Sequence, residues 1–215
     1  MKQLFLRRNG SSRLVLFFAG FGQDERPFAV RNKSGCDLGM VYDYEDDVFD
    51  FSLYRDYQRV DVVAWSMGVM MAARILEKAA LPVTGTVAVN GTLEGIDDEL
   101  GIGFAMWEAT QTALSAVSIG KFYRRMCTPA DAGYYLEHCP ERDLTGLKKE
   151  LQYLKSVALS VKPSAFSFDR AYVGLKDRII PCDNQRRSWS KHGVKTIEGD
   201  FAHFPFDKLS QELEL

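Results

Sequence analysis

Five short apolar runs constrain the fold of this chain more than any other feature of its sequence. They occupy residues 14–19, 60–65, 83–89, 171–174 and 194–197. Runs that lack a regular polar alternation are typical of strands buried on both faces, as in a parallel sheet covered by helices. Turn signals and helical patterns separate the runs. The sequence therefore predicts an α/β domain with right-handed crossovers between parallel strands.

Weaker signals complete this outline. A further strand is expected at residues 3–7, ahead of the hairpin-type turn Asn9-Gly10. Helical patterns occupy residues 67–80, 184–192 and 206–213. The outline contains only one strand before the strong strand at 14–19.

The alternation of strands and helices is interrupted between residues 93 and 168. Helical patterns occur there at 121–126 and 144–161, and no strand is convincing. We predict a core formed by residues 1–92 and 169–215, with residues 93–168 inserted between two core strands as a helical cap. Such insertions commonly form functional lids and loops.

Composition excludes several classes of protein. The 215 residues suit one domain, and 46% of them are hydrophobic, as in a packed globular protein. Lys and Arg total 27 against 29 Asp and Glu, so nucleic acid is not expected as the main partner. The longest apolar run, 14–21, is far shorter than the ~20 residues that cross a bilayer. With no signal-peptide pattern at its start, the protein is expected to be cytoplasmic and away from the membrane.

The cysteines predict neither disulfides nor a metal site. No two of them form a C-x-x-C pair, and their density is low for a disulfide framework. All four are expected to be reduced thiols: Cys36, Cys127, Cys139 and Cys182.

The most informative segment surrounds Ser66. A buried strand stops, one serine follows and a helix begins at once, with the small residues Ala64 and Gly68 two positions away on either side. A serine on a tight strand-to-helix turn needs small neighbours at that spacing, because larger side chains would collide. Ser66 is therefore a candidate nucleophile, and the alternative is an ordinary helix cap. The N–H of the following residue, Met67, is a candidate oxyanion donor.

Three further loops supply candidate partners. Gly20 and Gly22 flank Phe21 after the strand at 14–19, and the Phe21 N–H is the second candidate oxyanion donor. Asp177 follows the strand at 171–174 and could orient a histidine, although Asp183 competes for that role.

His203 follows the last strand and is the candidate base. His138 lies in the predicted cap, and His192 lies near a helix C-terminus where it favours the helix dipole. The candidates appear in the order Ser66, Asp177, His203, which is that of the α/β-hydrolases. Because the carboxyl ends of parallel strands share one edge of a sheet, we expect the three side chains to meet there.

Seven motifs together resemble a known family. They are Phe18-Ala-Gly-Phe-Gly22, Val41-Tyr-Asp-Tyr44, Val63-Ala-Trp-Ser-Met-Gly68, Ala88-Val-Asn-Gly91, Tyr123-Arg-Arg-Met-Cys127, Asp177-Arg-Ile and Ile197-Glu-Gly199. The chain resembles the pimeloyl-ACP methyl ester carboxylesterases of biotin synthesis, most closely the BioG type. The resemblance implies an α/β-hydrolase fold with a mostly parallel central sheet flanked by helices, and a helical cap inserted before the acid-bearing strand.

The resemblance also implies an activity. The enzyme would hydrolyse the methyl ester of a pimeloyl group carried by acyl-carrier protein, with Ser66 as nucleophile, His203 as base and Asp177 as orienting acid. The amides of Phe21 and Met67 match the oxyanion positions, and Phe122 matches a lid residue that lines the acyl channel. This chemistry needs no metal and no organic cofactor. Two alternatives remain: a general carboxylesterase or thioesterase for small or CoA-linked acyl groups, and a non-catalytic binding module of the same fold.

The charge distribution favours an acidic partner at the cap. Residues 121–170 carry nine Lys or Arg and six Asp or Glu, whereas residues 23–61 carry five and ten. A basic cap suits an acidic carrier protein. We therefore expect Arg124 and Arg125 to contact acyl-carrier protein, with help from Lys121, Lys148 or Lys149; the alternative is an ordinary solvated helix face.

Overall fold

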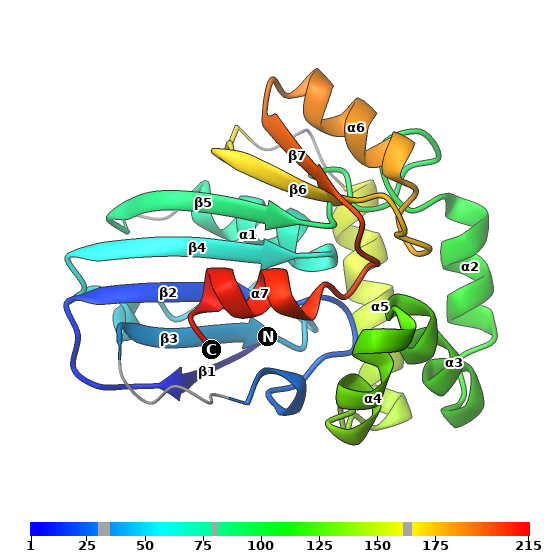
Figure 1. The fold of residues 1–215 in the computed structure, drawn as a ribbon, viewed down its shortest axis with the longest axis horizontal. Helices are drawn as coiled ribbons and strands as arrows, with labels where there is room; N and C mark the ends of the chain where they lie inside the picture. Colours follow the sequence, from blue (N-terminus) through cyan, green and yellow to red (C-terminus); the bar gives the residue numbers. More distant parts are fainter. Residues whose placement is uncertain (30–34, 79–80, 161–164) are drawn as a thin grey trace.

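A seven-stranded sheet forms the centre of the molecule in the computed structural model, which describes residues 1–29, 35–78, 81–160 and 165–215 (Figure 1). Its strand order is β1-β3-β2-β4-β5-β6-β7, and only β1 runs antiparallel to its neighbour. The strands are β1 (Lys2–Arg7), β2 (Arg13–Phe18), β3 (Asp37–Tyr42), β4 (Arg59–Trp65), β5 (Val83–Val89), β6 (Arg170–Gly174) and β7 (Lys195–Gly199). The predicted α/β fold with a mostly parallel sheet is confirmed.

Six of these strands match the expected ones, including the single strand that precedes β2. The strand β3 was not expected, although all six of its residues are buried. Gly39 interrupts its apolar run, and the space that a side chain would take is filled by Leu16 and Tyr54, whose nearest atoms would lie 3.3 and 3.4 Å from a Cβ. Tertiary packing thus explains why glycine occupies position 39, where it interrupts the apolar pattern by which the strand would have been recognised.

Helices cover both faces of the sheet. Figure 1 shows α7 (Phe206–Leu213) in front of the strands and α1 (Met67–Leu76) behind them. The helix α6 (Cys182–Lys191) follows β6, and short 3₁₀ turns occur at η1 (Arg26–Phe28) and η2 (Phe51–Leu53). The prediction for α7 has the correct bounds, and α6 starts two residues earlier than expected. The helix expected at 67–80 ends at Leu76, and its residues 79–80 lie outside the described part.

Four helices connect β5 to β6 and gather at one end of the sheet (Figure 1). They are α2 (Phe104–Thr112), α3 (Ala116–Met126), α4 (Pro129–Glu137) and α5 (Leu144–Leu159). Both helical patterns read in this segment are present, with α3 beginning five residues early; residue 161 of the second pattern lies outside the described part. The helices α2 and α4 were not individually expected. Within the described ranges, no helix is long and apolar enough to cross a membrane. All four cysteines are free thiols.

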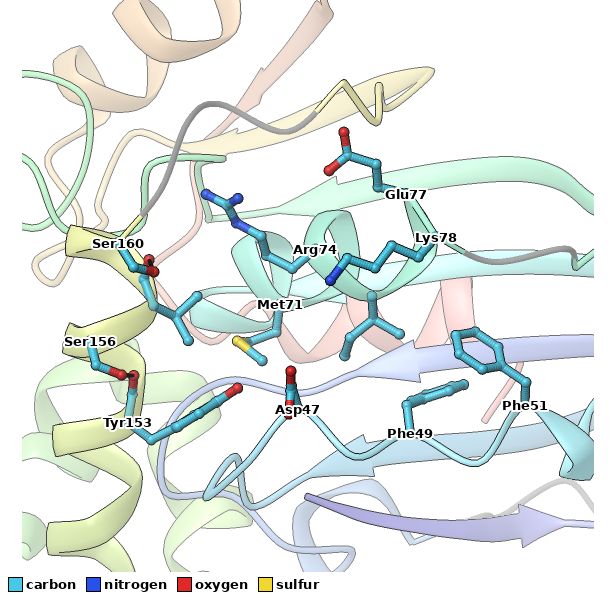
Figure 2. Close-up of a pocket in the computed structure, with 12 residues that line it drawn as sticks. Asp47, Phe49, Phe51, Met71, Arg74, Glu77, Lys78, Tyr153, Ser156 and Ser160 are labelled. Carbon is cyan, nitrogen blue, oxygen red and sulfur yellow. Dashed lines mark hydrogen bonds between the residues drawn. The ribbon is translucent and has the colours of Figure 1, made fainter.

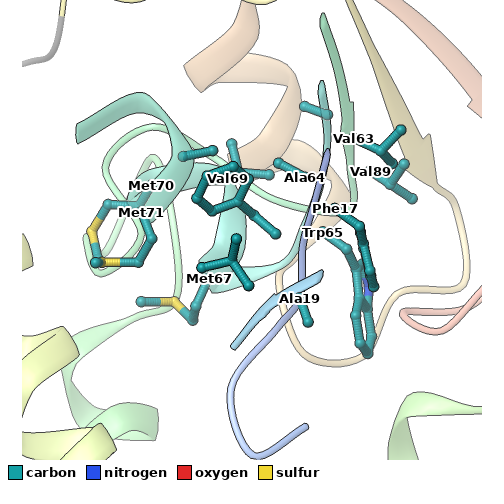
Figure 3. Packing of buried hydrophobic residues seen from close by; sticks show 14 of the residues in the cluster. Phe17, Ala19, Val63, Ala64, Trp65, Met67, Val69, Met70, Met71 and Val89 are labelled. Carbon is teal, nitrogen blue, oxygen red and sulfur yellow. The ribbon is translucent and has the colours of Figure 1, made fainter. Parts of the chain in front are cut away.

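The turn from β4 into α1 is tightly packed. Nine of the ten residues of α1 are buried, because the sheet covers one side of the helix and other segments cover the rest. Figure 3 shows Val69 on the side of α1 that faces the strands, with Met70 and Met71 on the side away from them. Gly68 lies so close to β2 that a Cβ there would stand 2.3 Å from the Phe18 carbonyl oxygen and 2.4 Å from that of Ala19. The turn therefore requires glycine at position 68.

The packing around Gly68 predicts how a methyl group added at this position would change the stability of the protein. We expect Gly68→Ala to lower the free energy of unfolding by about 2 kcal/mol or more, because the clash is with backbone that cannot turn away. Gly120→Ala is the matched control: Gly120 is inside α3 and a Cβ there meets nothing within 4 Å. It should raise stability by up to about 1 kcal/mol. Urea unfolding of both variants tests this, and equal stability of the two would contradict it.

Candidate active site

Ser66 occupies a strained turn at the carboxyl end of β4. Its backbone has φ 58° and ψ −129°, a conformation that non-glycine residues rarely adopt. The side chain is buried, and its Oγ lies 2.8 Å from Nε2 of His203. Ser66 makes no side-chain cap bond to α1. The helix-cap alternative therefore does not account for this serine, whose hydroxyl is directed to an imidazole instead.

Asp177 lies on the other side of the imidazole. Its Oδ2 is 2.8 Å from Nδ1 of His203, and the side chains of both residues are almost fully excluded from solvent, at 0% and 1% exposed. The N–H groups of Ile179 and Ile180 donate to Oδ1 of Asp177, and the Gln185 amide donates to Oδ2. With these four partners the carboxylate is held in one orientation.

The competing acid and the other histidines lie elsewhere. The Asp183 side chain is 69% exposed and pairs with Arg186 on the same helix. His192 contacts Glu94, and His138 stacks on Tyr134 at the end of α4. The structure thus brings together Ser66, Asp177 and His203 and leaves the alternatives apart.

Two residues that the sequence analysis did not single out fix the loop of His203. Nε1 of Trp65 donates to the His203 carbonyl oxygen over 2.7 Å. Nδ2 of Asn90 donates to the carbonyl oxygens of Ala202 and His203, and its Oδ1 accepts from the N–H of Gly174. Asn90 thereby links the loop of the histidine to the strand that precedes Asp177. Its position after β5, at the same sheet edge as the other residues, was the available sequence signal.

The loop after β2 passes directly over Ser66. A Cβ at Gly20 would lie 3.0 Å from Cβ and 3.4 Å from Oγ of Ser66, so only glycine lets the loop approach this closely. Phe21 follows in this loop. On the other side of the serine, Met67 is the first residue of α1, and its N–H therefore has no acceptor within the helix. Both candidate oxyanion residues line the same cavity as Ser66.

That cavity is small, about 50 Å³, and mostly apolar. The core contributes Phe21, Ser66, Met67 and Ile179; the segment between β5 and β6 contributes Ile102, Met106, Trp107, Thr110, Phe122, Arg125 and Leu151. The expected lining residue Phe122 is therefore at the cavity, where its ring packs against that of Phe21. Arg125 is the only charged residue of this lining.

The basic residues expected to contact a carrier protein differ in their ion pairing. Arg124 and Arg125 end α3 and are exposed, as is Lys121. Lys149 already pairs with Glu45, whereas Lys148 is exposed on α5.

A larger hollow of about 450 Å³ lies away from Ser66, between α1, α5 and the segment that follows β3. Figure 2 shows Arg74 and Met71 on one side of it and Tyr153 on the other. Its lining mixes Asp47 and Glu77 with Arg74 and Lys78 and contains none of the hydrogen-bonded residues described above. The larger hollow is therefore separate from the candidate catalytic residues.

A family model and a curated relative each match most of the chain. The family model described as pimeloyl-ACP methyl esterase BioG matches residues 1–212. A malonyl-[acyl-carrier protein] O-methyltransferase of Bacteroides fragilis is 38% identical over 200 residues, which cover 93% of this chain. The chain spans only 41% of the length of that methyltransferase.

The solved structures agree in fold. The crystal structure of BioG from Haemophilus influenzae has a TM-score of 0.85 at 30% identity and covers 97% of this chain and 96% of its own. An enol-lactonase from Burkholderia xenovorans has a TM-score of 0.69 at 12% identity, covering 99% of this chain and 93% of its own, and supports the α/β-hydrolase fold alone. The match over nearly the whole chain confirms the expected family: this chain belongs to the BioG family of pimeloyl-ACP methyl esterases.

Proposed function

We propose that Ser66, His203 and Asp177 hydrolyse the methyl ester of pimeloyl-acyl-carrier protein and release methanol and pimeloyl-acyl-carrier protein. The observation that carries this proposal is the buried chain of two 2.8 Å hydrogen bonds from Asp177 through His203 to Ser66. Family membership supports the substrate. A cytoplasmic location is part of the same proposal, because the substrate is a carrier protein.

The first half of the reaction forms an acyl-enzyme. Nε2 of His203 accepts the proton of Ser66 as Oγ attacks the ester carbonyl, while Asp177 holds Nδ1–H and stabilises the imidazolium. The carbonyl oxygen becomes an oxyanion, and the N–H groups of Phe21 and Met67 would donate to it. Loss of one such donor costs about 3 to 4 kcal/mol of transition-state stabilisation in other hydrolases. His203 then returns the proton to the leaving oxygen, and methanol departs.

The second half repeats the chemistry with water. His203 takes a proton from the water that attacks the acyl-enzyme, and Ser66 leaves with the proton that His203 returns. No step requires a metal or an organic cofactor.

The cavity suits the methyl end of an extended substrate. A space of about 50 Å³ holds only a few atoms, so the methyl ester would enter it and the remaining acyl chain would run outward. We propose that residues 93–168 act as a cap that contacts this chain, with Phe122 against the methylene groups. Arg124 and Arg125 then face the carrier protein from the end of α3.

Two other functions compete with this proposal. A general esterase or thioesterase would use the same three residues, and comparing carrier-bound with free methyl esters separates it from the proposed enzyme. A non-catalytic binding module is disfavoured, because a hydroxyl, an imidazole and a carboxylate that only filled space would not need this alignment.

The first prediction concerns the nucleophile and base. Ser66→Ala and His203→Ala should each lower turnover of the carrier-bound methyl ester at least about a thousandfold, because losses in a triad cost several orders of magnitude. Circular dichroism should show an unchanged fold. A fluorophosphonate reagent should label the wild type at Ser66 and neither variant. Retention of more than about a tenth of the turnover would rule out the assignment.

A second prediction separates the two acids. Asp177→Asn should reduce kcat about 10³- to 10⁴-fold, because the amide cannot hold the imidazole in its working tautomer. Asp183→Asn should change kcat less than twofold, since its exposed carboxylate pairs only with groups on its own helix. Comparable kcat losses in the two variants would contradict the role of Asp177.

The third prediction tests the carrier surface. Arg124→Glu should raise KM for the carrier-bound ester several-fold at low salt and less at high salt, because salt screens the contact. Turnover of a small neutral ester should not change. Lys195→Glu is the control, since this exposed residue begins β7 at the opposite end of the strands from Ser66.

The pattern of losses distinguishes the outcomes. A loss with Arg124→Glu on both substrates would mean that Arg124 supports the cap rather than the carrier. Equal KM values for Arg124→Glu and Lys195→Glu would place the carrier elsewhere.

A further inference from the structure

The loop that carries Phe21 is held mainly by side chains of the segment between β5 and β6. The hydroxyl of Tyr123 in α3 donates to the Gly22 carbonyl oxygen over 2.7 Å. The hydroxyl of Tyr135 in α4 donates to Oε1 of Gln23 over 2.8 Å, and Arg142 donates to the Gln23 carbonyl oxygen. The cap thus fixes the backbone immediately after the candidate oxyanion donor.

Glu150 of α5 also holds this loop, by accepting hydrogen bonds from backbone N–H groups. Its Oε2 accepts from the N–H of Gly22 over 3.2 Å, and its Oε1 accepts from the N–H of Tyr44 over 3.3 Å. Arg142 lies 3.3 Å from Oε2. Glu150 is completely buried and belongs to none of the catalytic steps derived above.

Tyr44 extends the same connection back to the start of the loop. Its hydroxyl donates to the carbonyl oxygens of Ala19 and Val41 over 2.8 and 3.2 Å. Burial raises the pKa of Tyr44 well above its ordinary value, so this hydroxyl remains a donor. Glu150 therefore connects, through Gly22 directly and through Tyr44, to both ends of the loop that contains Phe21.

The three groups that contact the Glu150 oxygens are all donors: the N–H of Gly22, the N–H of Tyr44 and the guanidinium of Arg142. Burial raises the pKa of Glu150 to about 7, although Arg142 acts to lower it. Because the folded protein holds this proton more tightly than the unfolded chain, the resulting stability is present below about pH 4.5 and is lost as the pH rises through about 7. Keeping a carboxylate here opposes stability at neutral pH, which is typical of groups retained for function.

We propose that Glu150 is a positioning residue that sets the oxyanion loop through the N–H of Gly22, so that the Phe21 amide is aimed at the reacting carbonyl only while α5 is seated on the core. The inference rests on the proposed function. Glu150 acts through the backbone and touches no reacting atom. The cap then belongs to the catalytic machinery as well as to substrate binding.

The test uses two graded variants of the full chain and a small substrate. Glu150→Gln keeps one acceptor for two backbone N–H groups, and Glu150→Met keeps none at similar volume. With p-nitrophenyl butyrate, kcat should fall about 3- to 10-fold in Glu150→Gln and about 10- to 100-fold in Glu150→Met. These losses are smaller than for removal of an oxyanion donor, because the Phe21 N–H would only be displaced from its position. KM should stay within about twofold.

Matched controls separate positioning from stability. Glu94 is also a mostly buried carboxylate with several partners, Ser188, Lys191 and His192, all on α6 or at its end. Glu94→Gln and Glu94→Met should lose stability in urea yet keep kcat within about twofold. An alkylboronic acid adds to Ser66 Oγ and places an oxygen at the oxyanion position, so its Kd should rise in the Glu150 variants in parallel with the fall in kcat.

The kcat and KM values of the variants show whether Glu150 positions the loop. Glu150 variants that match their Glu94 counterparts in kcat, or that change KM alone, would overturn it. If Glu150→Met does not fold, Glu150→Gln against Glu94→Gln decides in the same way. Failure of the proposed function is recognised separately, because the wild type would then not hydrolyse the carrier-bound methyl ester, whatever its rate on p-nitrophenyl butyrate.

Discussion

The candidate active site depends on the direct contact between the first turn of α1 and the backbone of β2. A Cβ at Gly68 would lie within 2.4 Å of two carbonyl oxygens of β2 and the loop after it. Beside this contact the chain turns at Ser66 with a positive φ, and Gly20 lies over the serine. The strain at Ser66 is maintained because nearly all of α1 is buried.

Two parts of the chain then build one site from different directions. The parallel sheet brings Ser66, Asp177 and His203 to a common edge, and Asn90 ties two of the loops involved together. The segment between β5 and β6 supports the opposite side, where Tyr123, Arg142 and Glu150 hold the loop of Phe21. In this arrangement the proposed nucleophile and base are positioned by the core, whereas the proposed oxyanion donor depends on both parts.

Much of this could be predicted because the fold repeats a simple unit. Strand, turn and helix recur, and each candidate residue follows a strand, so their meeting at one edge follows from the parallel arrangement. The strand β3 escaped prediction because Gly39 breaks its apolar pattern to make room for Leu16 and Tyr54. The helix α4 escaped because it is short, starts at a proline and buries little besides Tyr135.

Local patterns along the chain were enough to predict the fold class, the order of the three catalytic candidates and the family. The contact of His203 with Asp177 rather than Asp183 depends on long-range packing, since both acids follow the same strand and only one is directed inward. The contacts of Glu150 are visible only in the folded structure. That carboxylate contacts an amide 128 positions earlier in the chain, and no local pattern encodes a hydrogen bond that forms only when α5 packs on the loop after β2.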